Sequence, residues 1–226
     1  MGDVEVKVIL LGGAGVGKSS ILKRFFMNEF NDTYIPTQGE FFFVHKYDSF
    51  SKKKRFSFNF WDTCGQERYR SINTQYYRDT EIVIYVIDGE RETTLNDIEF
   101  YVNDFHQKMN SSYEKILVVN KIDTFKGYTP SSMHRESMYK TCPFYNKIIQ
   151  CKEKFGFDDI IWTSAKLEEE SVKEIVTEIE KYVDSPHYEL SNVNDYYRSE
   201  FSTFAKRATN IRNMNPVNSR NSICNC

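Results

Sequence analysis

Residues 12–19 read GGAGVGKS, which fits the pattern G-x-x-x-x-G-K-S. The apolar, β-branched stretch Val4–Leu11 before them predicts a strand, and a helix is predicted from Lys18 to about residue 28. Between a strand and a helix, such glycines let backbone N–H groups surround phosphates, and the helix N-terminus favours negative charge. Lys18 adds a positive charge for the terminal phosphates, and the Ser19 hydroxyl is suited to bind magnesium. We therefore predict a nucleotide-phosphate loop, because an ordinary glycine-rich turn needs neither Lys nor Ser after it.

Strands and helices alternate along the chain beyond this loop. Further strands are predicted at residues 40–47, 55–61, 81–88, 115–120 and 160–163, and further helices at residues 93–109, within 131–154 and at 167–182. The first two of these strands are expected to form a hairpin with a solvated basic turn, and residues 126–143 an extended surface loop. The alternation indicates a three-layer α/β fold, with a six-stranded, mostly parallel sheet, one antiparallel edge strand and about five helices.

Length and composition limit the classes of protein to consider. With 226 residues the chain is long enough for one domain, placed at residues 1–184, and a flexible tail at residues 185–226. A net charge of -2 and a pI near 6.1 provide no attraction for DNA or RNA, so we expect no nucleic-acid partner. The cysteines form no closely spaced framework and no signal peptide is recognisable, so a reducing compartment is expected. The apolar runs are far shorter than the roughly 18 residues of a membrane-spanning helix, so any membrane attachment is expected to be covalent or through a partner.

A second motif, Asn120-Lys121-Ile122-Asp123, follows the strand predicted at residues 115–120. Guanine presents two neighbouring donors, N1–H and the N2 amino group, and the two oxygens of the Asp123 carboxylate can accept both. Adenine lacks this pair, and a buried polar group left unpaired by the wrong ligand can discriminate by about 10⁴ to 10⁵. Alone, the motif also fits a polar turn after a strand, but the phosphate loop upstream favours guanine recognition.

A third motif runs from Asp62 to Gln66 after the strand predicted at residues 55–61. Asp62 is placed to approach magnesium through water, and Gly65 has no side chain to keep its N–H from a γ-phosphate. Gln66 carries an amide donor and an acceptor, so it is suited to orient an attacking water. Gln66 is therefore the predicted catalytic residue.

With these motifs the chain resembles the Ras superfamily of small GTPases, and within it the Rab family. The resemblance spans about residues 4–183, and it includes Thr37 and the stretch TSAK at residues 163–166. The Rab assignment rests on residues 67–71 and 76–78 and on the terminal residues 224–226, which read CNC. The resemblance implies a Ras-like P-loop NTPase fold, GTP or GDP with Mg²⁺ as ligands, and slow hydrolysis of GTP to GDP and phosphate. It also implies a molecular switch that regulates vesicle and membrane traffic.

Site roles follow from the same resemblance. Thr37 is expected to bind magnesium together with Ser19 and Asp62, and also to sense the γ-phosphate. Phe30 is expected to pack on the guanine edge. The resemblance implies three catalytic residues, Gln66, Lys18 and Thr37. The expected nucleotide-binding residues are Gly13, Ala14, Gly15, Val16, Gly17, Lys18, Ser19, Ser20, Phe30, Tyr34, Thr37, Asp62, Gly65, Asn120, Lys121, Asp123, Ser164, Ala165 and Lys166.

The terminal Cys224 and Cys226 resemble a double geranylgeranylation site. One lipid chain gives only marginal membrane binding, so two chains would provide a stable anchor. The resemblance implies a monomer on the cytoplasmic face of an intracellular membrane, which cycles with the cytosol. Its expected partners are a GTPase-activating protein, a guanine-nucleotide exchange factor, a GDP-dissociation inhibitor or Rab escort protein, and effectors that contact the switch regions.

Several positions depart from the Rab pattern and leave alternatives open. Ala14 stands where Rab proteins often carry Ser, and Cys64 replaces the usual alanine, which leaves the hydrolysis rate open. Residues 38–42 also differ in the first switch, and the segment around residues 126–143 looks longer than the family norm. One alternative is a nucleotide-binding scaffold with little or no turnover, although Gln66 and Thr37 argue against it. Another is an ATP-using phosphoryl-transfer enzyme, which conflicts with Asp123.

Overall fold

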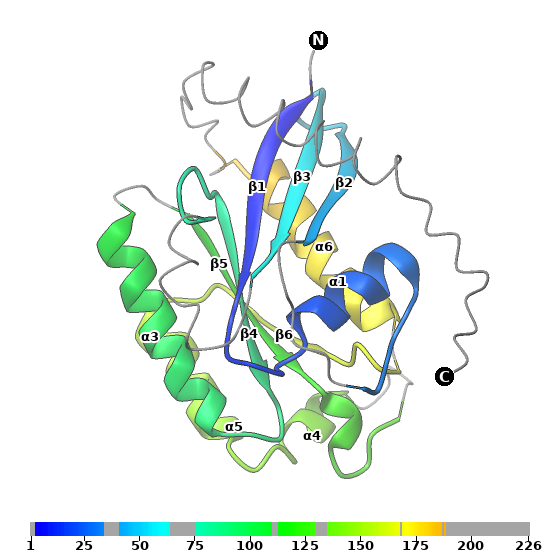
Figure 1. Ribbon diagram of the computed structural model, residues 1–226, viewed down its shortest axis with the longest axis vertical. Coiled ribbons are helices and arrows are strands. Elements are labelled where there is room, and N and C mark those ends of the chain that lie inside the picture. Colours follow the sequence, from blue (N-terminus) through cyan, green and yellow to red (C-terminus); the bar gives the residue numbers. More distant parts are fainter. Residues whose placement is uncertain are drawn as a thin grey trace, which may run out of the picture. The chain divides into compact units, whose positions relative to one another are not determined.

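The computed structural model (Figure 1) describes residues 3–33, 41–63, 76–109, 113–129, 135–167, 169–186 and 188. In chain order the elements are β1 (Val4–Leu11), α1 (Lys18–Met27), β2 (Phe41–Ser49), β3 (Lys54–Asp62), β4 (Ile82–Asp88), α3 (Thr93–Lys108), β5 (Glu114–Asn120), the 3₁₀ turn η3 (Ile122–Thr124), α4 (Arg135–Tyr139), α5 (Tyr145–Phe155), β6 (Ile160–Thr163) and α6 (Glu169–Asp184). The predicted strands and their succession are confirmed, with small differences at their ends.

The six strands form one sheet in the order β2-β3-β1-β4-β5-β6. Only the edge strand β2 runs antiparallel, in its hairpin with β3, and the other neighbouring pairs are parallel. This confirms the predicted mostly parallel sheet with one antiparallel edge strand. Because the carboxyl ends of parallel strands lie at one edge, the loops after β1, β3, β5 and β6 meet there, where open α/β sheets bind ligands.

Helices cover both faces of the sheet (Figure 1). Successive side chains of a strand point to opposite faces, so Val6, Val8 and Leu10 share one buried cluster with side chains of α1 and α6. Ile9 and Leu11, which point to the other face, are equally buried, and α3 packs against β4 on that side. Burial on both faces explains why the central strand β1 is almost continuously apolar.

The helical region predicted within residues 131–154 is present, but it is divided in two. The structure has two helices there, α4 and α5, separated by residues 140–144. Pro143 lies in this break, and proline lacks a backbone N–H donor and restricts the residue before it. The prediction of an extended loop at residues 126–143 is wrong in its last part, because α4 lies inside it.

Aromatic stacking explains how α4 and α5 are held on the sheet. Tyr139 of α4 stacks on Trp162 of β6, with ring centroids 4.7 Å apart and an interplanar angle of 8°. Tyr145 of α5 stacks on the same indole at 5.8 Å and 18°. Both helices therefore pack against the edge strand β6.

All the described residues belong to one compact unit, which spans residues 1–189. Tyr188 is buried although it lies beyond the predicted domain boundary after Asp184. Its ring lies 5.8 Å from that of Phe56, and its hydroxyl donates to Glu81 Oε2 at 2.8 Å. Among the described residues, no helix combines the length and the apolar character needed to cross a bilayer.

Candidate functional site

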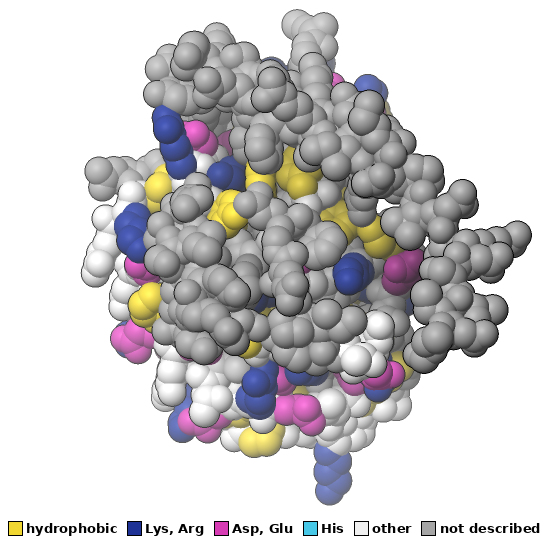
Figure 2. All heavy atoms as spheres, viewed as in Figure 1, with side chains coloured by type: hydrophobic (Ala, Val, Ile, Leu, Met, Phe, Trp, Pro, Cys, Tyr) yellow, Lys and Arg dark blue, Asp and Glu magenta, His cyan; other side chains and the backbone are white. Residues whose placement is uncertain are grey.

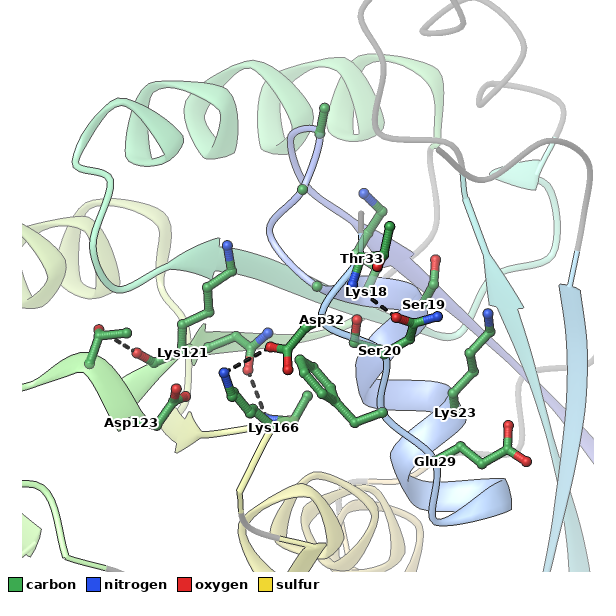
Figure 3. A pocket seen from close by; sticks show the side chains of 18 of the residues that line it. Lys18, Ser19, Ser20, Lys23, Glu29, Asp32, Thr33, Lys121, Asp123 and Lys166 are labelled. Atoms are coloured by element: carbon green, nitrogen blue, oxygen red, sulfur yellow. Dashed lines mark hydrogen bonds and ion pairs between the residues drawn. The ribbon is translucent and has the colours of Figure 1, made fainter. Parts of the chain in front are cut away.

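A cavity of about 360 Å³ lies at the carboxyl edge of the sheet (Figure 3). It is bordered by the phosphate loop and first turns of α1, by residues 29–33, and by the loops that follow β3, β5 and β6. Its lining residues are Ala14, Gly15, Gly17, Lys18, Ser19, Ser20, Lys23, Glu29, Phe30, Asn31, Asp32, Thr33, Thr63, Asn120, Lys121, Asp123, Thr124, Ala165 and Lys166. In Figure 3, Lys18 and Ser19 lie toward one end of the cavity and Asp123 toward the other.

The phosphate loop turns sharply into α1 at Gly17. Its φ of 101° lies in the left-handed region, and a Cβ there would lie 2.1 Å from Asn120 Nδ2, so only glycine fits. Lys18 follows as the first helical residue and is 5% exposed. Its ammonium group donates to the carbonyls of Gly12, at 2.8 Å, and Gly13, at 3.2 Å. The loop thus holds a positive charge over its own backbone, at the N-terminus of a helix.

Asp62 ends β3 beneath this loop and is 4% exposed. Neither of its carboxylate oxygens accepts a hydrogen bond from the residues that the structure describes. Burial raises the pKa of this carboxyl, and the charges of Lys18 and Lys23 oppose that shift. The nearby Ser19 hydroxyl opposes it too, although its geometry falls short of a hydrogen bond to either oxygen. A buried carboxylate without a donor is costly, and a divalent cation bound to oxygen ligands would offset that cost. Ser19 and Asp62 therefore fit a magnesium ion, whereas the third predicted magnesium residue, Thr37, lies outside the described residues.

Asn120 connects the phosphate loop and the loop after β6, which border the cavity, to the loop after β4. Its side-chain amide donates to the carbonyl of Val16 at 2.9 Å and accepts from the N–H of Ala165 at 3.2 Å. Its own carbonyl accepts from the N–H of Gly89 at 2.8 Å. Asn120 is 2% exposed, so its described contacts are with the protein scaffold that positions the phosphate loop.

Asp123 lies on η3 and faces the cavity from the loop after β5. The hydroxyl of Ser164 donates to Asp123 Oδ1 at 2.6 Å, and the oxygen of that hydroxyl accepts from the N–H of Leu167 at 3.1 Å. Ser164 is fully buried, and its own N–H is bound by the Ser171 hydroxyl at 3.1 Å. The Asp123 carboxylate is therefore held in one orientation, with its acceptor oxygens at the cavity wall.

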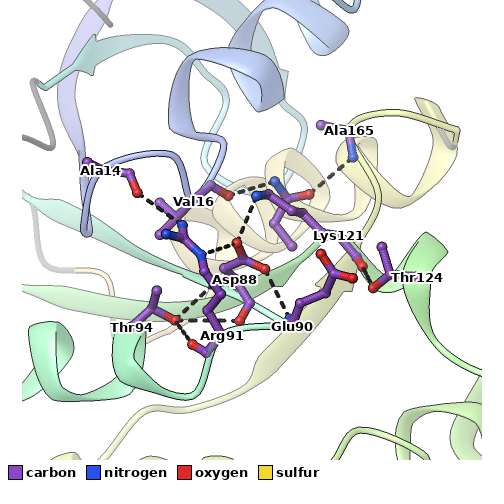
Figure 4. Close-up of polar contacts among 10 residues, drawn as sticks. Ala14, Val16, Asp88, Glu90, Arg91, Thr94, Lys121, Thr124 and Ala165 are labelled. Carbon is purple, nitrogen blue, oxygen red and sulfur yellow. Dashed lines mark hydrogen bonds and ion pairs between the residues drawn. The ribbon is translucent and has the colours of Figure 1, made fainter. Parts of the chain in front are cut away.

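A second ionic centre lies beside the loop, around Asp88 at the end of β4 (Figure 4). Its carboxylate accepts from Lys121 Nζ and from Arg91 Nε, both at 2.7 Å, and from the N–H of Glu90 at 3.0 Å. Burial raises the pKa of the Asp88 carboxyl, but these donors together outweigh burial and hold the pKa below its usual range. Arg91 Nη2 also donates to the carbonyl of Ala14 at 3.0 Å. Asp88 thus links the side chain of Lys121 to the backbone of the phosphate loop.

Arg24 of α1 supports the opposite wall of the cavity. It donates to the carbonyls of Ala165 and Lys166, each at 2.8 Å, and its guanidinium lies 5.9 Å from the centroid of the Phe30 ring. Lys166 Nζ pairs with Asp32 Oδ1 at 2.8 Å across the cavity. The loop after β6 and the segment around Phe30 are therefore joined through one side chain of α1.

The structure places most of the predicted nucleotide-binding residues around one cavity. Four of the described ones do not line it, namely Gly13, Val16, Asp62 and Ser164, and the last three of these are buried behind its wall. Other predicted residues lie outside the described part of the chain, namely Tyr34, Thr37, Gly65, Gln66, Cys224 and Cys226.

Sequence reasoning missed several residues that line or support the cavity. Lys23 lies four residues after Ser19, and this helical spacing, which puts both on one face of α1, could have identified it. Arg24, Asp88 and Arg91 carry no motif, and their contacts bridge segments far apart in sequence. Asp32 follows Phe30 in a segment without regular structure, so no periodicity marked it.

Comparison with known proteins places these features in context. The family model described as "Ras family" matches residues 7–185. The Ras-related protein SEC4 of Saccharomyces cerevisiae is 33% identical over 172 residues, which is 75% of this chain and 78% of that protein. The GTP-binding protein yptV2 of Volvox carteri is 37% identical over 121 residues, 54% of this chain and 55% of the relative.

The Ras-related protein RABE1e of Arabidopsis thaliana is 38% identical over 121 residues, again 54% of this chain and 55% of the relative. The matches to yptV2 and RABE1e thus span about half the length of those relatives. The match to SEC4 extends over most of both chains.

Proposed function

The chain belongs to the Ras family, and we propose that it is a GTP-binding and GTP-hydrolysing molecular switch of the Rab type, acting in vesicle and membrane traffic. The observation that supports this proposal best is a single cavity with a cationic phosphate loop at one end and the oriented carboxylate of Asp123 at the other. A guanine nucleotide matches both ends.

At the phosphate end, the N–H groups of the loop and the N-terminus of α1 bind the phosphate oxygens. Lys18 exchanges its carbonyl partners on Gly12 and Gly13 for the terminal phosphates, which are stronger acceptors because they are charged. Arg91 holds the carbonyl of Ala14 and so fixes the loop in the conformation that binds the phosphates.

At the base end, Asp123 accepts from N1–H and the N2 amino group of guanine. Ser164 leaves the carboxylate little freedom to rotate toward another ligand. The ring of Phe30 and the segment at Ala165 and Lys166 complete the walls on either side of the base. Adenine would offer the Asp123 carboxylate no pair of donors in place of those of guanine, which is the physical basis of the proposed specificity.

For hydrolysis, Gln66 orients the attacking water and Thr37 senses the γ-phosphate, both on segments outside the described residues. Magnesium held by Ser19, Thr37 and Asp62 would neutralise charge on the phosphate oxygens. The orphaned carboxylate of Asp62 supports that placement. Slow turnover keeps the switch in its GTP state until an activating protein supplies further charge stabilisation, which can accelerate hydrolysis by about 10³ to 10⁵.

Partner binding is proposed at the two switch segments, residues 34–40 and 64–75, which lie outside the described residues. Three aromatic side chains, Phe42, Trp61 and Tyr76, flank them. The ring of Trp61 lies 5.1 Å from that of Phe42 and 5.9 Å from that of Tyr76. Phe42 and Tyr76 are partly exposed over the buried Trp61, and aromatic side chains are enriched at protein interfaces, so this cluster supports an effector surface beside the two switch segments.

Membrane attachment is proposed through prenyl groups on Cys224 and Cys226 at the cytoplasmic face of an intracellular membrane. Exchange factors, activating proteins and a GDP-dissociation inhibitor or Rab escort protein are the proposed regulators. Changing both cysteines to Ser should abolish the membrane fraction in cells. An unchanged membrane fraction would refute prenyl anchoring and leave the nucleotide chemistry untouched.

Competition between nucleotides tests the base specificity of the purified protein. Fluorescent GDP is expected to be displaced by GTP and GDP but not by equal concentrations of ATP. Asp123→Ala should weaken GTP binding strongly, because it removes both acceptors of the guanine edge. Glu170→Ala is the matched control, since Glu170 is an acidic residue that pairs with Lys173 on α6. Displacement by ATP as efficient as by GTP would contradict the proposal.

A further inference from the structure

The turn between β2 and β3 carries an unusual side chain. Phe50 is 93% exposed, and the next most exposed large hydrophobic residue in the described part of the chain, Leu167, reaches 55%. Because β3 runs parallel to β1, the turn before β3 lies at the opposite end of these strands from the loop between β1 and α1, as Figure 1 shows. That loop borders the nucleotide cavity. Neither the core nor the nucleotide site therefore accounts for this phenyl ring.

Positive charge is in excess around Phe50. Two of the acidic residues nearby form ion pairs, Asp48 with Arg55 at 2.6 Å and Asp3 with Lys46 at 2.9 Å, and the third, Asp184, lies beside the cation of Lys52. Lys53 and Lys54 are exposed, and their ammonium groups have no ion pair or hydrogen bond with the residues that the structure describes. Elsewhere, on the face in Figure 2, basic and acidic side chains are interspersed.

The turn also borders a hollow. A surface cavity of about 480 Å³ is lined by Asp3, Val4, Asp48, Ser49, Phe50, Lys53, Lys54 and Arg55. Since Asp3 and Asp48 are neutralised by their partners, the net charge of this hollow comes from Lys53 and Lys54. Local backbone conformation does not explain the choice of lysine at residue 53. The φ of Lys53 is 51°, in the left-handed region, which favours Gly or Asn.

This turn is fixed to the end of α6, where the chain continues toward residues 190–226. Lys52 Nζ donates to the carbonyl of Ser185 at 2.8 Å. The carboxylate of Asp184 accepts from the hydroxyls of Tyr47 at 2.5 Å, Ser51 at 2.8 Å and Ser49. The exposed ring and the two lysines therefore stand on a rigid support, next to the point where the predicted lipid-bearing tail begins.

We propose that Phe50, Lys53 and Lys54 form a second membrane contact, in which the phenyl ring enters the interface of an anionic bilayer and the lysines bind lipid phosphates. Aromatic rings with flanking lysines are suited to this interface, and two weak attachments give a stable anchor where one does not. Each lysine near an anionic surface strengthens binding about fivefold. The proposal extends the proposed tail anchor, because the two together would orient the domain with its nucleotide cavity facing away from the membrane.

The test uses the full chain without lipid modification and vesicles of phosphatidylcholine with or without phosphatidylserine. Sedimentation is expected to show binding to the phosphatidylserine vesicles at low salt. The double variant Lys53→Ser and Lys54→Ser should lower the partition coefficient by roughly 25-fold, as two lysines at about fivefold each imply. High salt should remove most of this difference, because screening shortens the reach of exposed charges.

A matched control is Lys126→Ser with Lys140→Ser, which removes two exposed lysines from the loop after η3 and the end of α4. This pair should leave vesicle binding within about twofold of wild type, since it lies away from the turn. Equal losses in the two double variants, or no preference of the wild type for phosphatidylserine, would overturn the proposal. A partner protein with an acidic surface would then be the occupant to consider for the turn.

Insertion of the ring has a separate readout. The native Trp61 and Trp162 are only 6% and 7% exposed, so Phe50→Trp adds the one exposed indole among the described residues. Its emission should shift to the blue with phosphatidylserine vesicles and stay unchanged with phosphatidylcholine alone. An unchanged emission with both would refute insertion. Binding of fluorescent GDP, measured on the same samples, separates a failure of this proposal from a failure of the proposed GTPase function.

Discussion

Replacing Asp88 with Asn is expected to speed nucleotide release although Asp88 does not line the cavity. The carboxylate is 1% exposed and accepts from Lys121 Nζ and Arg91 Nε, each at 2.7 Å. Asn has nearly the same shape, but it is neutral and turns an NH₂ group toward one of these donors. Each charge-assisted hydrogen bond contributes about 1.5 to 3 kcal/mol. Lys121 and Arg91 are 35% and 48% exposed and regain water, so we expect a net loss of about 2 kcal/mol in the free energy of unfolding.

The same substitution frees two parts of the nucleotide site. Lys121 loses its anchor, and Arg91 is no longer aligned to hold the carbonyl of Ala14. If about half of the lost free energy acts on the bound state, GDP should dissociate roughly fivefold faster. Stopped-flow release of fluorescent GDP measures this rate, and urea denaturation measures the stability loss.

The matched control for this prediction is Asp104→Asn. Asp104 is a partly buried aspartate on α3 that pairs with Lys108 at 2.5 Å and accepts from the Tyr77 hydroxyl at 2.9 Å, away from the cavity. It should lower stability and leave the release rate unchanged. If Asp88→Asn also releases GDP at the wild-type rate, Asp88 has only a structural role and the reasoning fails.

Other consequences concern the metal site, pH and the edge of the sheet. Burial raises the pKa of Asp62, which means that its charged form is unfavourable without a metal, so Asp62→Asn should melt no lower than wild type in EDTA. The variant should nevertheless lose the rise in Tm that magnesium gives the GDP complex. An undiminished rise would exclude Asp62 from the metal site. Burial and the neighbouring Asp158 carboxylate raise the pKa of Glu114 to about 8, with Glu178 adding to this effect and Lys115 opposing it. The unfolded chain loses this proton near the ordinary pKa of 4.5, whereas the folded protein keeps it until about pH 8, so the protein loses stability as pH rises from 4.5 toward 8. Glu114→Gln cannot titrate, so its Tm should depend less on pH over this range. Identical Tm profiles for variant and wild type would contradict the assignment. Trp162→Ala removes the support of Tyr139 and Tyr145 and should cost about 3 to 5 kcal/mol in urea denaturation, whereas a cost below about 1 kcal/mol would mean that α4 and α5 are held elsewhere.

The sheet and the cavity were predictable because their signals are local. The apolar run Val4–Leu11 and the phosphate loop after it define a strand, a turn and a helix within a few residues. The Asn120 to Asp123 motif likewise follows directly on β5. Where a motif is continuous in sequence, the fold only has to bring a few strand ends to one edge, and this parallel sheet does so.

The parts that sequence reasoning missed depend on contacts between distant segments. The break between α4 and α5 reflects stacking of Tyr139 and Tyr145 on Trp162 as well as the local effect of Pro143. The contact from Arg91 to Ala14 joins residues 77 positions apart, and that from Arg24 to Ala165 joins residues 141 apart. No periodicity or spacing in one sequence identifies such pairs before the fold is known.

Single-turnover hydrolysis of bound GTP by the purified protein with magnesium is the most direct test of the proposed switch. We expect slow phosphate release from the wild type, and none from Gln66→Leu, because leucine cannot orient the attacking water. Tight GTP binding without phosphate release from either protein would contradict the account and favour a nucleotide-binding scaffold.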